Sequence, residues 1–262
     1  MLRAYLLMKV QSLKAQLQYP ANFLLNIFGV SLTGFAEVLA IFLLTSAFTT
    51  IGGWNFWQVG LMAGLWRLAH SLHQAYFLGV WEHHWLVRDG EYDRILTRPA
   101  HPLLQILASG FHLEAVGELF PAVTLFILCT PHVQVPWNIA NILFLGLVVL
   151  SGALIEAAVY LFFATFDFWF PETGKLWIAS AFLFPATRYP LHIYGRVFAS
   201  FVTYLFPFGF IAYYPIHHFL QITPQDGARF FPYISPLVAG ISVSIALGFW
   251  SVGLRHYQST GT

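Results

Sequence analysis

Long apolar stretches dominate the chain and are separated by short polar connections. A run of about 20 apolar residues is long enough for an α-helix to cross the hydrocarbon core of a bilayer. Six such stretches are predicted to span a membrane, and they cover residues 22–48, 56–80, 113–130, 137–166, 197–220 and 233–254. The pattern therefore predicts an all-α polytopic membrane protein in which residues 1–262 form a single transmembrane domain.

The residues before the first span follow a different pattern. At about 100° per residue, one narrow apolar stripe collects Leu2, Leu6, Val10, Leu13 and Leu17. The opposite side carries Arg3, Gln11, Lys14 and Gln18. An amphipathic helix of this kind lies in the plane of the membrane interface, so residues 1–20 are predicted to form an interfacial helix. A short cytosolic tail is the alternative interpretation.

Composition supports a membrane protein and excludes several other classes. Only 9% of the residues are charged, whereas 58% are hydrophobic. A soluble domain carries about 25% charged residues, so this chain has too few to cover a soluble surface. The composition thus excludes a cytosolic globular domain, a disordered chain and a nucleic-acid binder. The single cysteine, Cys129, cannot form an intrachain disulfide.

The placement of the basic residues predicts the orientation, because cytoplasmic loops retain Lys and Arg. If six spans place both termini and residues 167–196 on the cytoplasmic side, ten of the 12 basic residues lie there. In the alternative arrangement Lys175–Pro185 crosses the membrane, which moves Arg188 and Arg196 outside and weakens the bias. We predict the first arrangement.

Two charged residues fall at similar depths within neighbouring predicted spans. At about 1.5 Å per residue, Glu37 lies about 22 Å from the inner end of the first span, and Arg67 lies about 20 Å from that of the second. Charges inside a membrane are costly and are usually paired or functional. We therefore predict a Glu37–Arg67 ion pair, which either locks two helices together or lines a polar pathway.

Further polar residues lie in or near the predicted spans. Arg67, His70 and Gln74 share one helix face through spacings of three and four, so that face is predicted to point into protein or water. His70 and Gln74 are thus candidates for lining a pathway. Glu114 and Glu118 are predicted to lie at a solvated helix end.

Histidine pairs and small residues give two more expectations. The histidine pairs His70/His73, His83/His84 and His217/His218 fall on different sides of the membrane in the predicted topology, so no metal site is expected. The last span carries Gly240, Ser244 and Gly248 at spacings of four. Such a stripe lets helix backbones approach closely, and it predicts a tight helix contact within or between subunits.

The polar segment 83–102, between the second and third spans, has the signals of a short surface helix. Asp89 is suited to cap this helix by accepting from the free amides of its first turn. Arg94 and Arg98 suit the negative C-terminal end of the helix dipole, and Pro99 stops the helix. The predicted apolar face consists of Tyr92, Ile95 and Leu96. Such a helix is either a docking element or an ordinary capped surface helix.

This segment also resembles the signature of a known family. The run Gly90-Glu-Tyr-Asp93-Arg-Ile-Leu96-Thr-Arg98-Pro99 is similar to the Gly-x-x-Asp-x-x-Leu-x-Arg-Pro signature of bacterial ABC-2 type permeases, in a branch of short six-span permeases. Further similar stretches follow in order along the chain: Pro102 and Gln105, Tyr189–Tyr194, Pro207–Ile211 with Tyr214-Pro215, and the tail Arg255–Gly261. Tyr92 stands where the family more often has a leucine, which keeps an apolar contact.

The resemblance implies a permease subunit of an ATP-driven exporter in the bacterial cytoplasmic (inner) membrane. Two permeases, identical or homologous, would join two ABC ATPase subunits within the lipid, and no nucleic acid would be involved. The segment 83–102 would couple ATP hydrolysis to helix rearrangement. The residues implied in coupling to the ATPase are Gly90, Tyr92, Asp93, Arg94, Ile95, Leu96, Arg98 and Pro99. ATP and magnesium would belong to the ATPase, so this chain is expected to hold no cofactor and no catalytic residue.

The same resemblance guides the expected substrate. In this class the second and fifth spans line the pathway, and the fifth span here is rich in aromatic residues, among them Phe201 and Tyr204. Aromatic faces attract desolvated cations, so we expect export of a hydrophobic or amphipathic compound, cations included. A lipid-facing aromatic belt is the other interpretation of these rings. The alternative functions are a six-span secondary carrier or channel built on Glu37 and Arg67, and a membrane-embedded enzyme.

Overall fold

The structure is a computed structural model. It describes residues 9–11, 14, 16–109, 112, 115–170, 184, 186–224 and 228–259. Within these residues the secondary structure is helical, apart from one isolated β-bridge between Ile51 and Trp54. The all-α prediction is therefore confirmed. Most of the predicted interfacial helix lies outside the described residues, and its described parts, Lys9–Gln11, Lys14 and 16–17, are helical.

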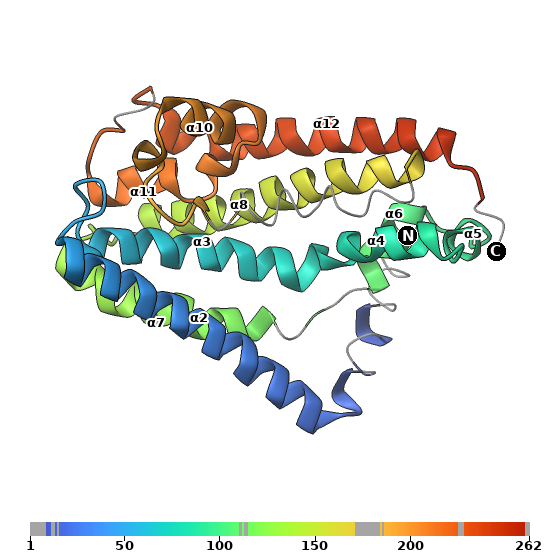
Figure 1. Ribbon diagram of the computed structural model, residues 1–262, viewed down its shortest axis with the longest axis horizontal. Coiled ribbons are helices and arrows are strands. Elements are labelled where there is room, and N and C mark those ends of the chain that lie inside the picture. Colours follow the sequence, from blue (N-terminus) through green and yellow to red (C-terminus); the bar gives the residue numbers. More distant parts are fainter. Residues whose placement is uncertain are drawn as a thin grey trace.

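The molecule is built from long helices, most of which run close to its longest axis, whereas α2 runs obliquely to it (Figure 1). The long helices are α2 (Pro20–Phe48), α3 (Phe56–Phe77), α7 (Ala115–Val133), α8 (Ile139–Thr165) and α12 (Ser235–His256). Helix α3 is central, because it packs against α2, α7 and α8, while α12 packs against α8. The short helices α4 (His83–Arg88), α5 (Tyr92–Leu96) and α6 (Pro102–Ser109) gather at one end, together with the C-terminal end of α12 (Figure 1). We call this the α5 end of the molecule.

The turn between α2 and α3 lies at the opposite end, and its sequence explains where α3 begins. Gly52 and Gly53 adopt φ of +59° and +82°, a conformation that glycine reaches without steric cost. Asn55 then caps α3: its side chain accepts from the backbone N–H of Gln58 at 3.1 Å, and the Gln58 side chain accepts from the backbone N–H of Asn55 at 3.1 Å. This reciprocal capping box satisfies two N–H groups that the helix leaves free.

Four of the described helical stretches are long and apolar enough to cross a membrane: Pro20–Phe48, Ala115–Val133, Ile139–Phe168 and Ser235–His256. They match the first, third, fourth and sixth predicted spans. Helix α3 has the length of a span but is more polar, and its buried residues run from Val59 to His73. A polar helix of this length is sheltered from lipid by the helices around it.

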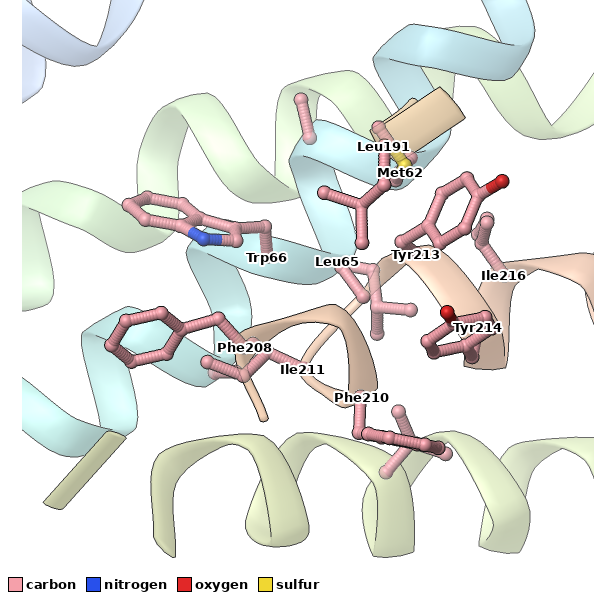
Figure 2. Packing of buried hydrophobic residues seen from close by; sticks show 14 of the residues in the cluster. Met62, Leu65, Trp66, Leu191, Phe208, Phe210, Ile211, Tyr213, Tyr214 and Ile216 are labelled. Atoms are coloured by element: carbon pink, nitrogen blue, oxygen red, sulfur yellow. The ribbon is translucent and has the colours of Figure 1, made fainter. Parts of the chain in front are cut away.

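The fifth predicted span, 197–220, is wrong as a continuous helix. It consists of two arms bent by 79° at a short break. The first arm comprises α10 (Arg196–Ser200) and the π-helical η5 (Phe201–Leu205), and the second comprises η6 (Phe208–Phe210) and α11 (Tyr213–Leu220). Pro207 lies at the break, where its lack of an N–H and its fixed φ oppose helix continuation. Figure 2 shows the second arm seated against Met62, Leu65 and Trp66 of α3.

The prediction that residues 167–196 lie at one face is also wrong. Asp167 lies at the α5 end, within 3.2 Å of His83. His192, in contrast, lies at the other end, where its Nε2 is 2.7 Å from the Gly52 carbonyl oxygen. Asp167 and His192 therefore lie at opposite ends of the molecule. Of Lys175–Pro185, only Phe184 is among the described residues, and its ring lies 4.5 Å from that of Trp66.

The small-residue stripe of α12 does not contact another described helix. Gly240, Ser244 and Gly248 are exposed, and the Ser244 hydroxyl donates to the Gly240 carbonyl of the same helix. Among the described residues the stripe thus makes no tight helix contact, and a contact between subunits stays a prediction. The close approach lies instead at Gly253, where an added Cβ would be 2.6 Å from Cγ2 of Thr165 in α8. The spacing of small residues along an apolar helix does not by itself reveal which side of that helix faces protein.

These two positions give a matched test of the α8–α12 contact. We expect Gly253→Ala to lower the free energy of unfolding by about 1–3 kcal/mol, because the added methyl overpacks Thr165 and Phe168. Gly248→Ala meets nothing within 4 Å and should leave the stability unchanged or raise it. Thermal unfolding in detergent measures both. Equal effects at the two glycines would contradict the described packing.

Candidate functional site

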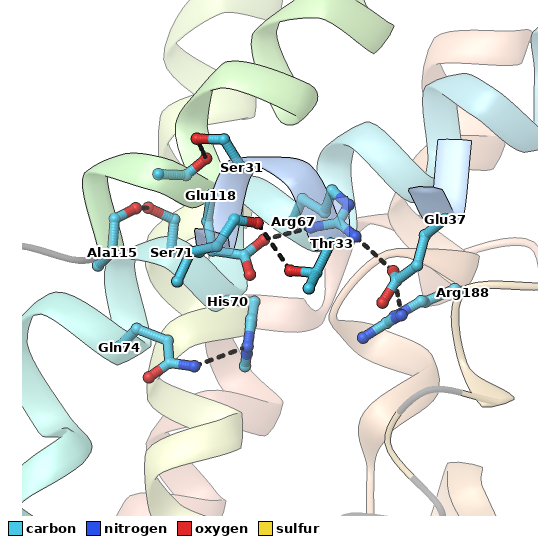
Figure 3. Close-up of polar contacts among 12 residues, drawn as sticks. Ser31, Thr33, Glu37, Arg67, His70, Ser71, Gln74, Ala115, Glu118 and Arg188 are labelled. Carbon is cyan, nitrogen blue, oxygen red and sulfur yellow. Dashed lines mark hydrogen bonds and ion pairs between the residues drawn. The ribbon is translucent and has the colours of Figure 1, made fainter. Parts of the chain in front are cut away.

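Arg67 of α3 is the centre of a polar network inside the helix bundle. The residue is only 3% exposed. Its Nη2 contacts the carboxylate of Glu37 in α2, and its Nη1 contacts that of Glu118 in α7 (Figure 3). The planar guanidinium presents its donors in a fork, which suits two carboxylates at once. One buried cation thereby joins three long helices.

Arg188 adds a second cation to this network. Its Nη1 also contacts the carboxylate of Glu37, and its guanidinium carbon lies 4.0 Å from the centre of the Trp66 ring. The indole N–H of Trp66 donates to the Thr187 hydroxyl at 3.0 Å. These contacts fix the described part of the chain before η4 (Leu191–Tyr194) against α2 and α3. Two guanidinium groups and the carboxylates of Glu37 and Glu118 balance in formal charge.

A second group of polar residues lies one turn further along α3. His70 Nδ1 is 2.8 Å from Oε1 of Glu156 in α8, and His73 Nε2 is 3.8 Å from the same oxygen. Gln74 Nε2 lies 3.1 Å from His70 Nε2 (Figure 3). Glu156 is fully buried, and its second oxygen contacts no donor among the described residues. We call Glu37, Arg67, His70, Gln74, Glu118, Glu156 and Arg188 the interior network.

The structure brings Glu37 and Arg67 together, as their depths in the sequence suggest, but two of their partners differ from expectation. Glu118 is not at a solvated helix end, because its carboxylate contacts Arg67. Arg188 does not lie at a membrane face. Glu114 lies outside the described residues. A second carboxylate could have been expected from the side chain of Arg67 itself. Its guanidinium has five N–H donors, and a single carboxylate leaves some of them unpaired.

The four candidate pathway residues fall in two places. His70 and Gln74 belong to the interior network, whereas Phe201 and Tyr204 lie in η5. Tyr204 is 72% exposed and borders a cavity of about 320 Å³ between α8, the bend at Pro207 and α12. No residue of the interior network lines that cavity. The structure therefore does not unite these four residues in one site.

At the α5 end, the predicted apolar face of the short helix is only partly exposed. Tyr92 is completely buried, with its ring centroid 5.4 Å from that of His83, 5.3 Å from Phe168 and 4.8 Å from Tyr257. A buried ring cannot touch another protein, so Tyr92 as a direct ATPase contact is wrong. Leu96 remains 43% exposed. From Glu91 to Pro99, the other exposed residues are Glu91, Arg94, Thr97, Arg98 and Pro99.

Asp93 faces the C-terminal tail of the same chain. Its Oδ1 accepts from the Tyr257 hydroxyl at 2.8 Å, and its Oδ2 accepts from the Ser259 hydroxyl at 2.6 Å. The hydrogen bonds from Ser259 and Tyr257 lower the pKa of Asp93. Burial, together with the neighbouring Asp93 carboxylate, raises the pKa of Tyr257. At neutral pH Asp93 is thus the ionised acceptor and Tyr257 the donor.

Further contacts hold α4 and α5 in place. Asp167, in η2 (Phe166–Phe168), lies 3.2 Å from His83 Nδ1 and 3.4 Å from His84 Nδ1. The Gln105 side chain donates to the carbonyls of Ile95 and Ala100 at 2.9 and 2.8 Å. Gly90 has φ +71°, which turns the chain between α4 and α5.

The predicted cap of this helix is wrong. Asp89 is the C-terminal cap residue of α4, and its Oδ1 accepts from Arg88 at 3.0 Å. The turn at Gly90 separates Asp89 from α5, whose N-cap is Glu91 without a side-chain capping bond. Helix α5 therefore begins without a side-chain cap.

A family model described as ABC-2 family transporter protein matches residues 32–261 of the chain. The chain belongs to the ABC-2 family. The resemblance carried by residues 90–105 and the tail is thereby confirmed. Comparisons with curated proteins and with solved structures give no match. This ABC-2 protein is a multi-pass membrane permease of an ABC transporter, a family whose members generally work with ABC ATPases. The family match favours this function over a secondary carrier, a channel or a membrane-embedded enzyme.

The two carboxylates that contact Arg67 differ in their other partners. We expect Arg67→Leu to destabilise the permease by about 3–5 kcal/mol, because it leaves buried charge unpaired. Glu37 keeps Arg188 as a partner, but Glu118 loses its cation. Adding Glu118→Gln should therefore recover more stability than adding Glu37→Gln. Thermal unfolding and folded yield in detergent measure this, and equal or reversed recovery would contradict the described network.

Proposed function

We propose that this ABC-2 permease is the membrane subunit of an exporter, driven by two separate ABC ATPase subunits that bind at the α5 end. The observation that carries the proposal is the two-sided character of α5. One side is held by Tyr92 and Asp93 against Phe168 of η2 and against Tyr257, which follows α12. The opposite side exposes Arg94, Leu96 and Arg98. A helix anchored on one side and open on the other transmits an applied displacement to the helices behind it.

A groove beside α5 supports binding of a protein partner there. It has a volume of about 220 Å³, and its lining consists of Glu82, Leu86, Glu91, Arg94, Ile95, Arg98 and Gln105. Its lining combines apolar residues, Leu86 and Ile95, with charged residues of both signs. This combination suits insertion of a protruding partner side chain with complementary charge. In this proposal ATP and magnesium are held by the ATPase, and the permease contributes the surface on which the ATPase acts.

The distribution of the described basic residues supports a cytoplasmic α5 end. Six of them lie there: Lys9, Lys14, Arg88, Arg94, Arg98 and Arg255. Only Arg196 and Arg229 lie at the opposite end. Cytoplasmic loops retain basic residues. We propose that the chain crosses the bacterial inner membrane six times, with both termini cytoplasmic.

The substrate proposal rests on the bent element 196–220. Its break reaches the cavity bordered by Tyr204, Phe206 and Phe162, which is predominantly apolar. Such a surface suits a hydrophobic or amphipathic compound, and aromatic faces favour a desolvated cation. Export requires a second permease, identical or homologous, to complete the pathway, and α2 offers it an exposed apolar surface that includes Leu25, Phe28 and Leu32.

Charge reversal on α5 tests the coupling role. We expect Arg94→Glu combined with Arg98→Glu to abolish co-purification of the ATPase and to lose at least about tenfold of the permease-dependent change in ATPase rate, since complementary charges at a binding surface become repulsive. Arg229→Glu, at the opposite end, is the control and should behave as the wild type. If no ATPase associates with the wild-type permease, the proposal fails.

Labelling from outside the cell tests the orientation. In a Cys129→Ser background, Thr50→Cys lies in the α2–α3 turn and Glu91→Cys lies beside α5, and both positions are exposed. A membrane-impermeant maleimide should label Thr50→Cys in intact cells, and it should label Glu91→Cys only after the membrane is opened. The reverse pattern would place the α5 end outside and would separate it from any cytoplasmic ATPase.

A further inference from the structure

The tail that follows α12 uses both oxygens of the Asp93 carboxylate. Tyr257 and Ser259 each donate one hydroxyl, at 2.8 and 2.6 Å. The donors lie 164 and 166 residues away from Asp93 in the sequence. We call these three residues the tail clasp. Its acceptor carries a negative charge at neutral pH, so both bonds are of the strong, charge-assisted kind.

The clasp continues a buried aromatic cluster. The Tyr257 ring lies 4.8 Å from Tyr92 and 5.9 Å from Phe168. Trp250 of α12 packs on the same Phe168 at 4.9 Å. Because Tyr257 directly follows α12, its position is set by that helix. The clasp therefore fastens α5 to the end of α12. The packed rings of Tyr92, Phe168 and Trp250 oppose sliding of α5 relative to α12.

A second fastening joins the preceding helix to α8. His83 and His84 of α4 flank the carboxylate of Asp167, in the turn that ends α8. The α4–α5 segment is thus tied at two points to two different spans. These spans run side by side in the same direction, because Phe168 packs on Trp250 at one end and Asn141 and Tyr233 both contact His218 at the other.

We propose that Asp93 is the positioning residue of the coupling element, and that Tyr257 and Ser259 belong to that element because they transfer a displacement of α5 to α12. This inference rests on the proposed coupling role of α5. It assigns the Asp93 carboxylate to contacts within the permease rather than to the ATPase surface, and it gives the C-terminal tail a role in energy coupling.

Helix α12 leads from the clasp to the bent element 196–220. At its start, the Ser235 hydroxyl donates to the carbonyl of Phe210 at 2.8 Å, and Tyr233 lies 3.2 Å from His218 of α11. A rigid shift of α12 along its axis therefore reaches the second arm of the bent element. This arm packs against α3, which carries the interior network (Figure 2).

The first test removes the tail donors. The variant Tyr257→Phe with Ser259→Ala is reconstituted with the ATPase pair in lipid vesicles. We expect the complex to form as in the wild type, while the permease-dependent change in ATPase rate falls about tenfold, because both charge-assisted bonds are lost. Ser251→Ala is the matched control, since its hydroxyl bonds only to Leu247 of its own helix. A rate change within about twofold of the wild type would overturn the inference.

The second test restores the connection with a different bond. In the Cys129→Ser background, Asp93→Cys and Ser259→Cys replace two side chains in direct contact. The reduced protein should be uncoupled, and oxidation to the disulfide should restore the ATPase response, reversibly with a reductant. Each single-cysteine variant is the control. Failure of the disulfide to form, or a formed disulfide without recovery, would contradict the inference.

The two proposals fail in different ways. If the wild-type permease does not alter the ATPase rate, the coupling function itself is refuted, and the clasp has no coupling role. If the wild type responds, Arg94→Glu with Arg98→Glu abolishes binding, and the clasp variant keeps the full response, then only the role of the tail is refuted.

Discussion

The neutralisation of one buried cation organises the membrane part of this permease. A guanidinium in a bilayer is costly unless its donors are paired. Arg67 meets this requirement with the carboxylates of Glu37 in α2 and Glu118 in α7, and Arg188 also contacts Glu37, so that two cations face two carboxylates. The polar α3 is consequently held in the centre, with apolar α2, α7 and α8 around it. Each of these helices can present lipid with a hydrophobic face because the charges are satisfied inside.

Glycines allow the close approach that this arrangement requires. At Gly34 of α2, an added Cβ would lie 2.5 Å from Pro121 and 2.9 Å from Arg67 Nη1. At Gly117 of α7, it would lie 2.7 Å from the Ile27 carbonyl oxygen. The start of α7 is also fixed by two hydroxyls: Ser71 donates to the Ala115 carbonyl at 2.8 Å and Ser31 to that of Gly117 at 3.0 Å (Figure 3). The ion pairs and the backbone contacts therefore stabilise the same three-helix junction.

The sequence predicted those parts of the structure that depend on local pattern. Runs of apolar residues located most of the long helices, and equal depth brought Glu37 and Arg67 together. The signature around Asp93 identified the family. The path between residues 170 and 220 was not predictable in this way. A straight span and two bent arms can have the same apolar content. Apolar content therefore does not predict the break at Pro207.

Partners of the site residues were missed for a related reason. Glu118 lies near the start of its helix, where a solvated position is usual, but the two serine contacts and its ion pair hold that start beside Arg67. Asp93 and Tyr257 are far apart in sequence, and no periodicity connects them. Such contacts follow from how helices meet in three dimensions rather than from the pattern of any one helix.

The distance in sequence between Asp93 and its donors also orders events during synthesis. A ribosome makes α5 well before it makes Tyr257 and Ser259, because these lie 164 and 166 residues after Asp93. Until then α5 lacks both hydroxyl bonds and the Tyr257 ring that covers Tyr92. A truncated or unfinished permease therefore presents a loosely held α5. Residues that lie 164 and 166 positions beyond Asp93 thus complete the surface on which the motor would act.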